Sequence, residues 1–194
     1  EDPEQAFHAV RAAIGMIDAL PGVNARLQEK GLPPVSMRIG INSGEALVGN
    51  FGSRRRFNYS VMSDAVNLAS RLEGANKFYG TTVIASETTV ALTGDAFVWR
   101  ELDAIRVKGR IQALKIYELL ARAADLDPER KPLIENYAEG LAHWRAREFD
   151  RAAAAFDRSA GVDRPAALFR DRARQLAETP PGDDWDPIRS LQEK

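Results

Sequence analysis

The stretch "SDAVNLASRLEGANKFYG", Ser63 to Gly80, has the features of a single capped helix. Ser63 is a favoured N-cap residue, Asp64 suits the positive end of the helix dipole, and Gly80 is a typical helix terminator. Asn67 and Arg71 are four residues apart, so they project from one face of this helix about one turn from each other. Spacing alone leaves two interpretations open. The face is an ordinary exposed one with Arg71 paired to a nearby glutamate, or it offers an amide and a forked cation to a nucleotide triphosphate.

The residues before this helix predict strands. Apolar and polar residues alternate from Met37 to Ile41, and after Ser43-Gly44 a second apolar strip runs from Ala46 to Val48. This pattern predicts a β-hairpin between the two strips. The glycines and arginines of residues 49–58 indicate a loop that leads into a short strand at Tyr59–Met62.

The rest of the first 120 residues completes an α+β pattern. The sequence predicts a strand at residues 81–86, a short helix at Glu87–Leu92, and two later strands joined around Lys108-Gly109-Arg110. Apolar residues at three- and four-residue steps predict a helix from Pro3 to Leu20, which Pro21-Gly22 stops or turns before a weaker helical stretch. We therefore expect an α+β domain at residues 1–120 with a mostly antiparallel sheet.

The composition changes after residue 120. Charged residues and prolines predict a linker at residues 121–131. Residues 132–178 predict helices in which small residues lie beside aromatic ones, a pattern that resembles a tetratricopeptide-type helical hairpin. Residues 179–194 predict an extended tail that Trp185 anchors.

Composition and charge exclude several functions. Lys and Arg number 27 against 28 Asp and Glu, and this formal charge of −1 argues against nucleic acid or an anionic membrane surface as a partner. The chain has no cysteine, which excludes disulfides and thiolate metal sites. His8 and His143 are far apart, so we interpret each as a helix-surface residue rather than half of a metal pair. No apolar run approaches the length of about 20 residues that a membrane span needs, so we expect a soluble segment without membrane contact.

Three motifs resemble those of a known family. The runs "MRIGINSGEALVGNFGS" (37–53), "YSVMSDAVNLASRLEGANKFYG" (59–80) and "LDAIRVKGRIQALKIYELL" (102–120) look like the second half of a class III nucleotidyl cyclase catalytic domain of the bacterial adenylate cyclase style. The resemblance implies a partial ferredoxin-like domain that pairs head to tail with a second cyclase domain, with ATP in the groove between them. The implied reaction is attack of the ribose 3′-hydroxyl on the α-phosphate, which forms cyclic AMP and releases pyrophosphate.

The same resemblance assigns roles to four residues. Asn67 would hold the ribose in attack geometry, and Arg71 would stabilise negative charge on the phosphates in the transition state. Ser60 stands where the family reads the purine edge, and its hydroxyl can both donate and accept a hydrogen bond. Lys108 matches a family lysine that contacts the triphosphate, with Arg110 as a neighbour able to share that contact.

The resemblance also implies a metal-binding half that this sequence lacks. Family members carry two aspartates on N-terminal strands, which hold Mg²⁺ or Mn²⁺, and a lysine that reads the base. Glu45 and Asp64 are not substitutes, because Glu45 lies in a turn, Asp64 serves the helix N-terminus, and no second carboxylate accompanies either. We therefore expect the metal ligands upstream, no metal site in this chain, and an inactive homodimer of the chain alone. An intact second domain would complete one composite site.

These observations predict an adenylate cyclase fragment, a cytoplasmic segment whose parent protein is anchored in a membrane through upstream regions. Two alternatives stay open. One is a catalytically inactive cyclase-homology module that dimerises or binds a nucleotide. The other is a guanylate cyclase, which Ser60 alone does not exclude. Without the first strands a sheet edge is exposed, so we expect the chain to associate or to cover that surface with its own tail.

Overall fold

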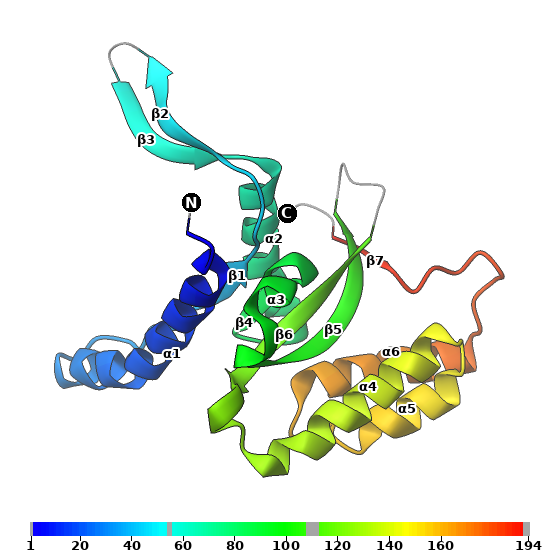
Figure 1. Cartoon of the computed structure of the whole chain (residues 1–194). Coiled ribbons are helices and arrows are strands. Elements are labelled where there is room, and N and C mark those ends of the chain that lie inside the picture. Colours follow the sequence, from blue (N-terminus) through cyan, green and yellow to red (C-terminus); the bar gives the residue numbers. More distant parts are fainter. Residues whose placement is uncertain (1, 54–55, 108–112, 192–194) are drawn as a thin grey trace.

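The structure is a computed structural model that describes residues 2–53, 56–107 and 113–191 of the 194-residue chain. Figure 1 shows the elements in chain order. They are α1 (Gln5–Glu29), β1 (Ile39–Ile41), β2 (Leu47–Ser53), β3 (Arg56–Met62), α2 (Asp64–Tyr79), β4 (Val83–Ser86), α3 (Glu87–Thr93), η1 (Gly94–Ala96), β5 (Phe97–Val107), β6 (Leu114–Arg122), η2 (Ala123–Asp125), η3 (Pro128–Arg130), α4 (Lys131–Arg145), α5 (Phe149–Asp157), α6 (Arg164–Glu178) and β7 (Arg189–Leu191).

The central sheet is mixed, so the expectation of a mostly antiparallel sheet is only partly correct. Its strand order in the described residues is β1-β4-β6-β5-β7. The inner pairs β4–β6 and β6–β5 are antiparallel, whereas the outer pairs β1–β4 and β5–β7 are parallel. The outer strands are joined to their neighbours by long connections that contain helices, and such connections permit parallel pairing where a tight turn does not.

The predicted hairpin between residues 37–41 and 46–48 is wrong. Ile39–Ile41 pairs with β4 instead, and residues 47–53 pair with residues 56–62 to form the β2–β3 hairpin, which includes most of the predicted loop. The chain does not turn back after β1 because its next residues are held elsewhere. Asn42 Nδ2 donates to the Ala65 carbonyl at 3.0 Å, and Ser43 Oγ lies 3.1 Å from Thr89 Oγ1.

The first helix is longer than the sequence predicts, because α1 continues through Pro21 to Glu29. Proline fixes φ near its helical value and costs one backbone hydrogen bond, which a long helix can tolerate. The outer end of α1 is held by Asn24, whose side chain donates to and accepts from the backbone of Val35 at 3.0 and 2.8 Å. Gly31, with φ of 70°, follows the end of the helix.

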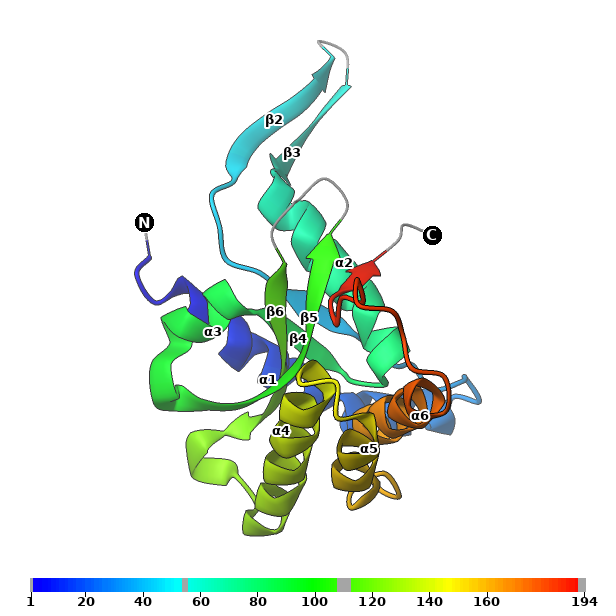
Figure 2. The ribbon, with the colours of Figure 1, turned by 90° about the vertical axis from the view of Figure 1, so that its right-hand side faces the viewer.

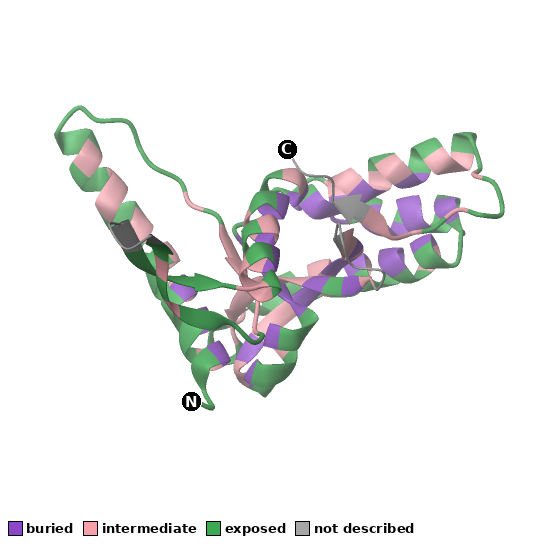
Figure 3. Ribbon diagram, turned by 90° about the horizontal axis from the view of Figure 1, so that it is seen from above, coloured by how far each residue is buried: buried purple, intermediate pink, exposed green. Residues whose placement is uncertain are grey.

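Helices cover both faces of the sheet. In Figure 2, α1 and α3 lie on one side, and α2 with α4–α6 lies on the other. Buried residues gather where α2, the sheet and α4–α6 meet, while the β2–β3 hairpin and the outer half of α1 are largely exposed (Figure 3). In the described residues, no helix is long and apolar enough to cross a membrane.

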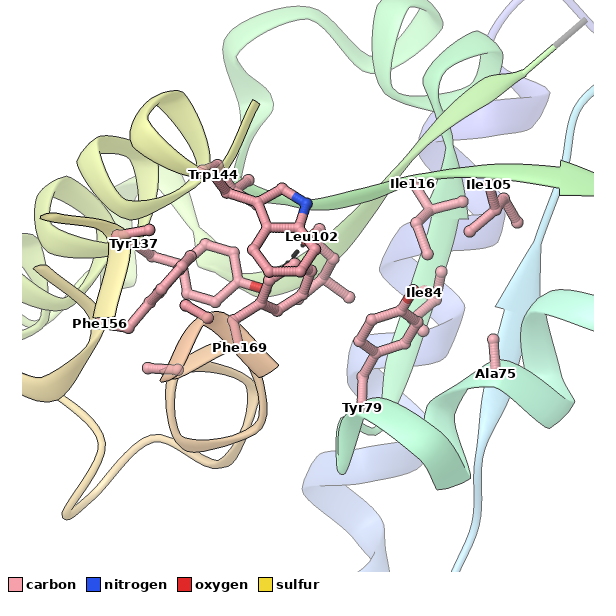
Figure 4. Close-up of a cluster of buried hydrophobic side chains, with 14 of the residues drawn as sticks. Ala75, Tyr79, Ile84, Leu102, Ile105, Ile116, Tyr137, Trp144, Phe156 and Phe169 are labelled. Atoms are coloured by element: carbon pink, nitrogen blue, oxygen red, sulfur yellow. Dashed lines mark hydrogen bonds between the residues drawn. The ribbon is translucent and has the colours of Figure 1, made fainter. Parts of the chain in front are cut away.

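One hydrophobic core joins the sheet to the C-terminal helices. Tyr137 of α4 is fully buried, and its hydroxyl donates to the Leu102 carbonyl of β5 at 2.9 Å. Figure 4 shows aromatic residues of α4–α6 on one side of Leu102 and residues of α2 and the sheet on the other. The cluster includes Leu72, Tyr79, Ile84, Leu102, Ile105, Ile116, Tyr137, Trp144, Phe156 and Phe169. The predicted division at residues 121–131 stays a prediction.

A buried arginine links the sheet to α6. Arg100 of β5 donates from Nη1 and Nη2 to the carboxylate of Asp163 at 2.6 and 3.0 Å, and from Nε to Glu118 of β6 at 3.1 Å. Its guanidinium carbon lies 4.6 Å from the ring centroid of Tyr137. Burial alone would lower the pKa of Arg100, but the charges of Glu118 and Asp163 raise it above its usual range. Asp163 also caps α6 by accepting from the Ala166 N–H at 3.2 Å.

The α2 helix approaches β1 so closely that only glycine fits at position 40. A Cβ on Gly40 would lie 2.1 Å from the Ala69 carbonyl oxygen and 2.3 Å from the Glu73 nitrogen, both backbone atoms of α2. At the far end of the same contact, the fully buried Asn76 donates from Nδ2 to the Ile39 carbonyl at 3.0 Å. The backbone of β1 and that of α2 therefore hold each other directly.

We predict that Gly40→Ala lowers the free energy of unfolding by about 3 kcal/mol or more, because the clash is with backbone that cannot move aside cheaply. Gly74→Ala is the matched control, since Gly74 is an exposed residue of α2 whose added Cβ would meet nothing within 4 Å. That variant should gain about 0.5–1 kcal/mol from helix propensity. Urea unfolding of both variants measures the difference, and equal stabilities would contradict the close contact.

We predict that Arg100→Met lowers the free energy of unfolding by about 3–5 kcal/mol, because it leaves the buried carboxylate of Asp163 and the largely buried one of Glu118 without their partner. Arg151→Ala is the control, since its side chain is 71% exposed and pairs with Glu148 on the surface of α5. That change should stay within about 0.5 kcal/mol. Fluorescence and circular dichroism should report a single shifted transition for Arg100→Met, and an unchanged midpoint would refute the role of this network.

Candidate functional site

The candidate site is built on α2, which begins and ends where the sequence predicts. Ser63 Oγ accepts a hydrogen bond from the Val66 N–H at 3.2 Å, and Asp64 is the first helical residue. Gly80 ends the helix in the left-handed conformation with φ of 76°, and its N–H donates to the Asn76 carbonyl at 2.8 Å. Both caps are local interactions, which is why the sequence alone reveals them.

Asn67 and Arg71 lie on the side of α2 that faces away from β1. At about 100° per residue, they sit roughly 200° and 240° around the helix from Ala65, which contacts the chain that follows β1. Asn67 is exposed and Arg71 is half-buried. The contact with β1 therefore fixes one side of the helix, and the Asn67 amide and the Arg71 guanidinium lie on another.

Ser60 is an exposed residue of β3, paired with Gly49 of β2 and three residues before the N-cap of α2. The β2–β3 hairpin leads directly into α2 (Figure 1). Ser60, Asn67 and Arg71 therefore lie on one continuous segment of the chain. Lys108 and Arg110 lie outside the described residues. Their roles, like those of Ser60, Asn67 and Arg71, stay predictions.

The described residues do not fit a divalent metal ion. In the ranges 2–53, 56–107 and 113–191, no three His, Cys, Asp or Glu side chains gather in a way that holds one. Glu45 lies exposed between β1 and β2, and Asp64 is exposed at the N-terminus of α2. His8 Nδ1 lies 2.9 Å from Asp2 Oδ2, and His143 Nδ1 lies 2.5 Å from Glu148 Oε2.

The sequence does not reveal the roles of two residues that shape the site, Gly40 and Asn76. Gly40 reads as one residue of an alternating strand, although its lack of a side chain is what lets α2 approach β1. Asn76 reads as a polar residue near a helix end, although it is buried and its Oδ1 accepts from Thr81 Oγ1 at 2.8 Å. A glycine inside a short strand is the one signal that points to a close backbone approach.

Comparisons with known proteins all find nucleotidyl cyclases. Residues 1–121 match the adenylate and guanylate cyclase catalytic domain. Adenylate cyclase 1 of Rhizobium meliloti (strain 1021) is 44% identical over 119 residues, which cover 61% of this chain and 18% of that protein. The adenylyl cyclase CyaB from P. aeruginosa has 30% identity and a TM-score of 0.56, covering 66% of this chain and 64% of the other. The guanylyl cyclase Cya2 has 32% identity and a TM-score of 0.55, with the same coverage.

The similarity has a defined extent. The chain spans 24% or less of the length of the first curated relatives that it matches. The family match begins at residue 1, just before α1, and ends at residue 121, within β6. It takes in the β2–β3 hairpin, α2 and β5, and α4–α6 lie beyond it. Since that match covers more than half of the chain, the chain belongs to the family of adenylate and guanylate cyclase catalytic domains.

Proposed function

We propose that this chain is part of an adenylate cyclase that converts ATP to cyclic AMP and pyrophosphate, and that it supplies the Asn/Arg half of a composite active site. The observation that carries the proposal is the pair Asn67 and Arg71, which stand one turn apart on the side of α2 turned away from β1. The match of the chain to adenylate cyclases supports the substrate.

In the proposed reaction the ribose 3′-hydroxyl attacks the α-phosphorus, and pyrophosphate leaves. The Asn67 side chain hydrogen-bonds the ribose and keeps the hydroxyl oriented toward phosphorus. The Arg71 guanidinium donates to phosphate oxygens as negative charge builds on them in the transition state. Lys108 contributes a further positive charge to the triphosphate. When bound, Mg²⁺ or Mn²⁺ would supply Lewis-acid activation, and we propose that its ligands come from upstream of this chain.

A second cyclase domain is the proposed partner, paired head to tail. The β2–β3 hairpin supports this proposal because it carries large apolar side chains in solvent. Leu47, Tyr59 and Met62 are 68%, 75% and 57% exposed. Large apolar side chains exposed together on one hairpin are typical of an interaction site on a soluble protein. The hairpin leads directly into α2, so a partner that covers it also lies beside Asn67.

The C-terminal helices are proposed to be tetratricopeptide-like and regulatory, in a parent protein with a membrane anchor upstream. Support for the first part comes from α4 and α5, which pack through a small residue and an aromatic one. A Cβ on Gly140 would lie 2.6 Å from the Phe156 ring, so the ring rests on the glycine backbone. The alternative to an adenylate cyclase is a catalytically inactive cyclase-homology module. The following experiment distinguishes these two functions.

We predict that this chain restores activity to a class III adenylate cyclase domain whose own Asn/Arg pair has been changed to alanine. That domain keeps its metal-binding aspartates and brings the complementary half of the site. Cyclic AMP formation by the mixture should fall about 10²- to 10³-fold when the chain carries Asn67→Ala or Arg71→Ala, because each removes a transition-state interaction.

Two substitutions on the same helix serve as controls for this experiment. Ser70→Ala and Lys77→Ala change exposed residues of α2 and should leave the rate within about twofold. If the mixture is inactive with the unmodified chain although the two domains associate by sedimentation, the chain is a non-catalytic partner. Equal rates for Asn67→Ala and the unmodified chain would refute the assigned role.

The choice between ATP and GTP is proposed to depend in part on Ser60. In the complemented enzyme, Ser60→Ala should lower the ratio of kcat/KM for ATP to that for GTP by up to about tenfold, the value of one hydrogen bond. Competition between the two nucleotides measures the ratio directly. A preference for GTP in the unmodified mixture would make the chain part of a guanylate cyclase instead.

A further inference from the structure

The segment after α6 returns to the sheet instead of leaving the molecule, and we call residues 179–191 the C-terminal strap (Figure 2). The Arg147 guanidinium donates to the Pro181 carbonyl at 2.6 Å. The ring of Trp185 packs edge-on against those of Trp144 and Phe149, with centroids 5.3 and 5.2 Å apart. The strap then ends in β7, which pairs in parallel with the last three residues of β5. The predicted anchor at Trp185 is thus confirmed, whereas the strand was not predicted.

The strap contacts the last turn of α2. Arg189, the first residue of β7, places its guanidinium carbon 3.4 Å from the ring centroid of Phe78. Just before it, Asp186 accepts from Arg106 Nη2 of β5 at 3.0 Å and from the Ile188 N–H at 2.9 Å. Phe78 is therefore covered by a cation that the sheet itself holds in place.

A buried carboxylate ties the same turn of α2 to β5 and α6. Tyr79, fully buried, donates from its hydroxyl to Asp103 Oδ2 at 2.7 Å, and Arg172 Nη1 lies 3.8 Å from the same oxygen. The Arg172 guanidinium lies between two rings, 4.8 Å from the centroid of Trp144 and 4.7 Å from that of Phe169. Burial, with the nearby Asp103 charge, raises the pKa of the Tyr79 hydroxyl, which therefore stays protonated as the donor.

We infer that the C-terminal strap, together with Arg172, is a clamp on the last turn of α2 that positions Asn67 and Arg71 for the reaction. The inference rests on the proposed function, since it takes these two residues as groups that act on ATP. Phe78 and Tyr79 lie in the last turn of α2, and Asn67 and Arg71 in its first two turns.

Helix rigidity connects the two ends. The backbone of β1 holds α2 along one side through Gly40 and Asn76, and Leu68 and Leu72 of α2 are buried in the core. The clamp adds a further hold at the last turn of the helix, where it opposes small shifts and rotations of α2 relative to the sheet. Because a displacement of about 1 Å in a reacting constellation costs on the order of 10²-fold in rate, a small rotation of α2 is enough to matter. Arg189 and Arg172 are positioning residues in this scheme, since neither touches substrate.

Hydrogen–deuterium exchange of the chain by itself tests the clamp. Arg189→Ala should raise exchange at least tenfold in residues 72–79 of α2, and Arg189→Lys should restore most of the protection because it keeps a cation over the Phe78 ring. Arg174→Ala is the matched control, an α6 arginine that is 53% exposed and pairs with Asp157. Exchange in β6 serves as the internal reference and should not change in any variant.

Kinetics of the complemented enzyme test the consequence. Arg189→Ala should lower kcat about tenfold with KM for ATP changed less than threefold, since Asn67 and Arg71 act mainly in the transition state. If Arg189→Ala merely unfolded part of the chain, it would lower the fraction of active enzyme. Arg189→Lys would then not restore kcat.

The two experiments distinguish failure of the clamp, failure of its positioning role and failure of the proposed function. Unchanged exchange in α2 with Arg189→Ala overturns the clamp, whatever the enzyme assay gives. Raised exchange with an unchanged kcat overturns the positioning role. If the unmodified chain complements no cyclase domain, the proposed function fails, and the exchange data then decide the clamp on their own.

Discussion

The arrangement of this protein depends on the absence of one side chain. Gly40 lets the backbone of β1 lie against the backbone of α2, with a hypothetical Cβ only 2.1 Å from the Ala69 carbonyl oxygen. Any larger residue would push the helix from the strand. That contact fixes which side of α2 is covered, and so leaves Asn67 and Arg71 on another side. Asn42 and Asn76 continue the same seam with hydrogen bonds from their side chains to backbone carbonyls of α2 and β1.

The second constraint is electrostatic and binds the C-terminal helices to the sheet. Arg100 donates to the carboxylates of Glu118 and Asp163, and its guanidinium lies over the ring of Tyr137 of α4. The Asp163 carboxylate also caps α6. An arginine is costly to bury unless every partner is present, so sheet and helices depend on each other for it. The helical segment thus shares its stability with the catalytic-domain fold. It also approaches α2 through Arg172 of α6, which lies beside the Asp103 carboxylate that accepts from Tyr79.

Much of the candidate site was accessible from the sequence because its signals are local. The caps at Ser63 and Gly80, the four-residue spacing of Asn67 and Arg71, and the short helix after β4 each depend on residues a few positions apart. The family resemblance added what spacing could not, namely the roles of those residues. It did not reveal Gly40, whose importance lies in a contact with residues about 30 positions away.

The sequence by itself determined α2, β4, α3, the two strands β5 and β6, and the anchoring of the tail by Trp185. Helix caps, runs of β-branched residues and a single aromatic residue in a polar segment are local signals, because each reflects the conformational or burial preference of a few neighbouring residues. Only the tertiary structure decided the pairing. It placed β1 beside β4 instead of in a hairpin, carried α1 through Pro21, and brought β7 to the edge of β5. The physical reason is that a strand's partner is set by burial and backbone hydrogen bonds between distant residues, which compete with local turn signals and here outweigh them.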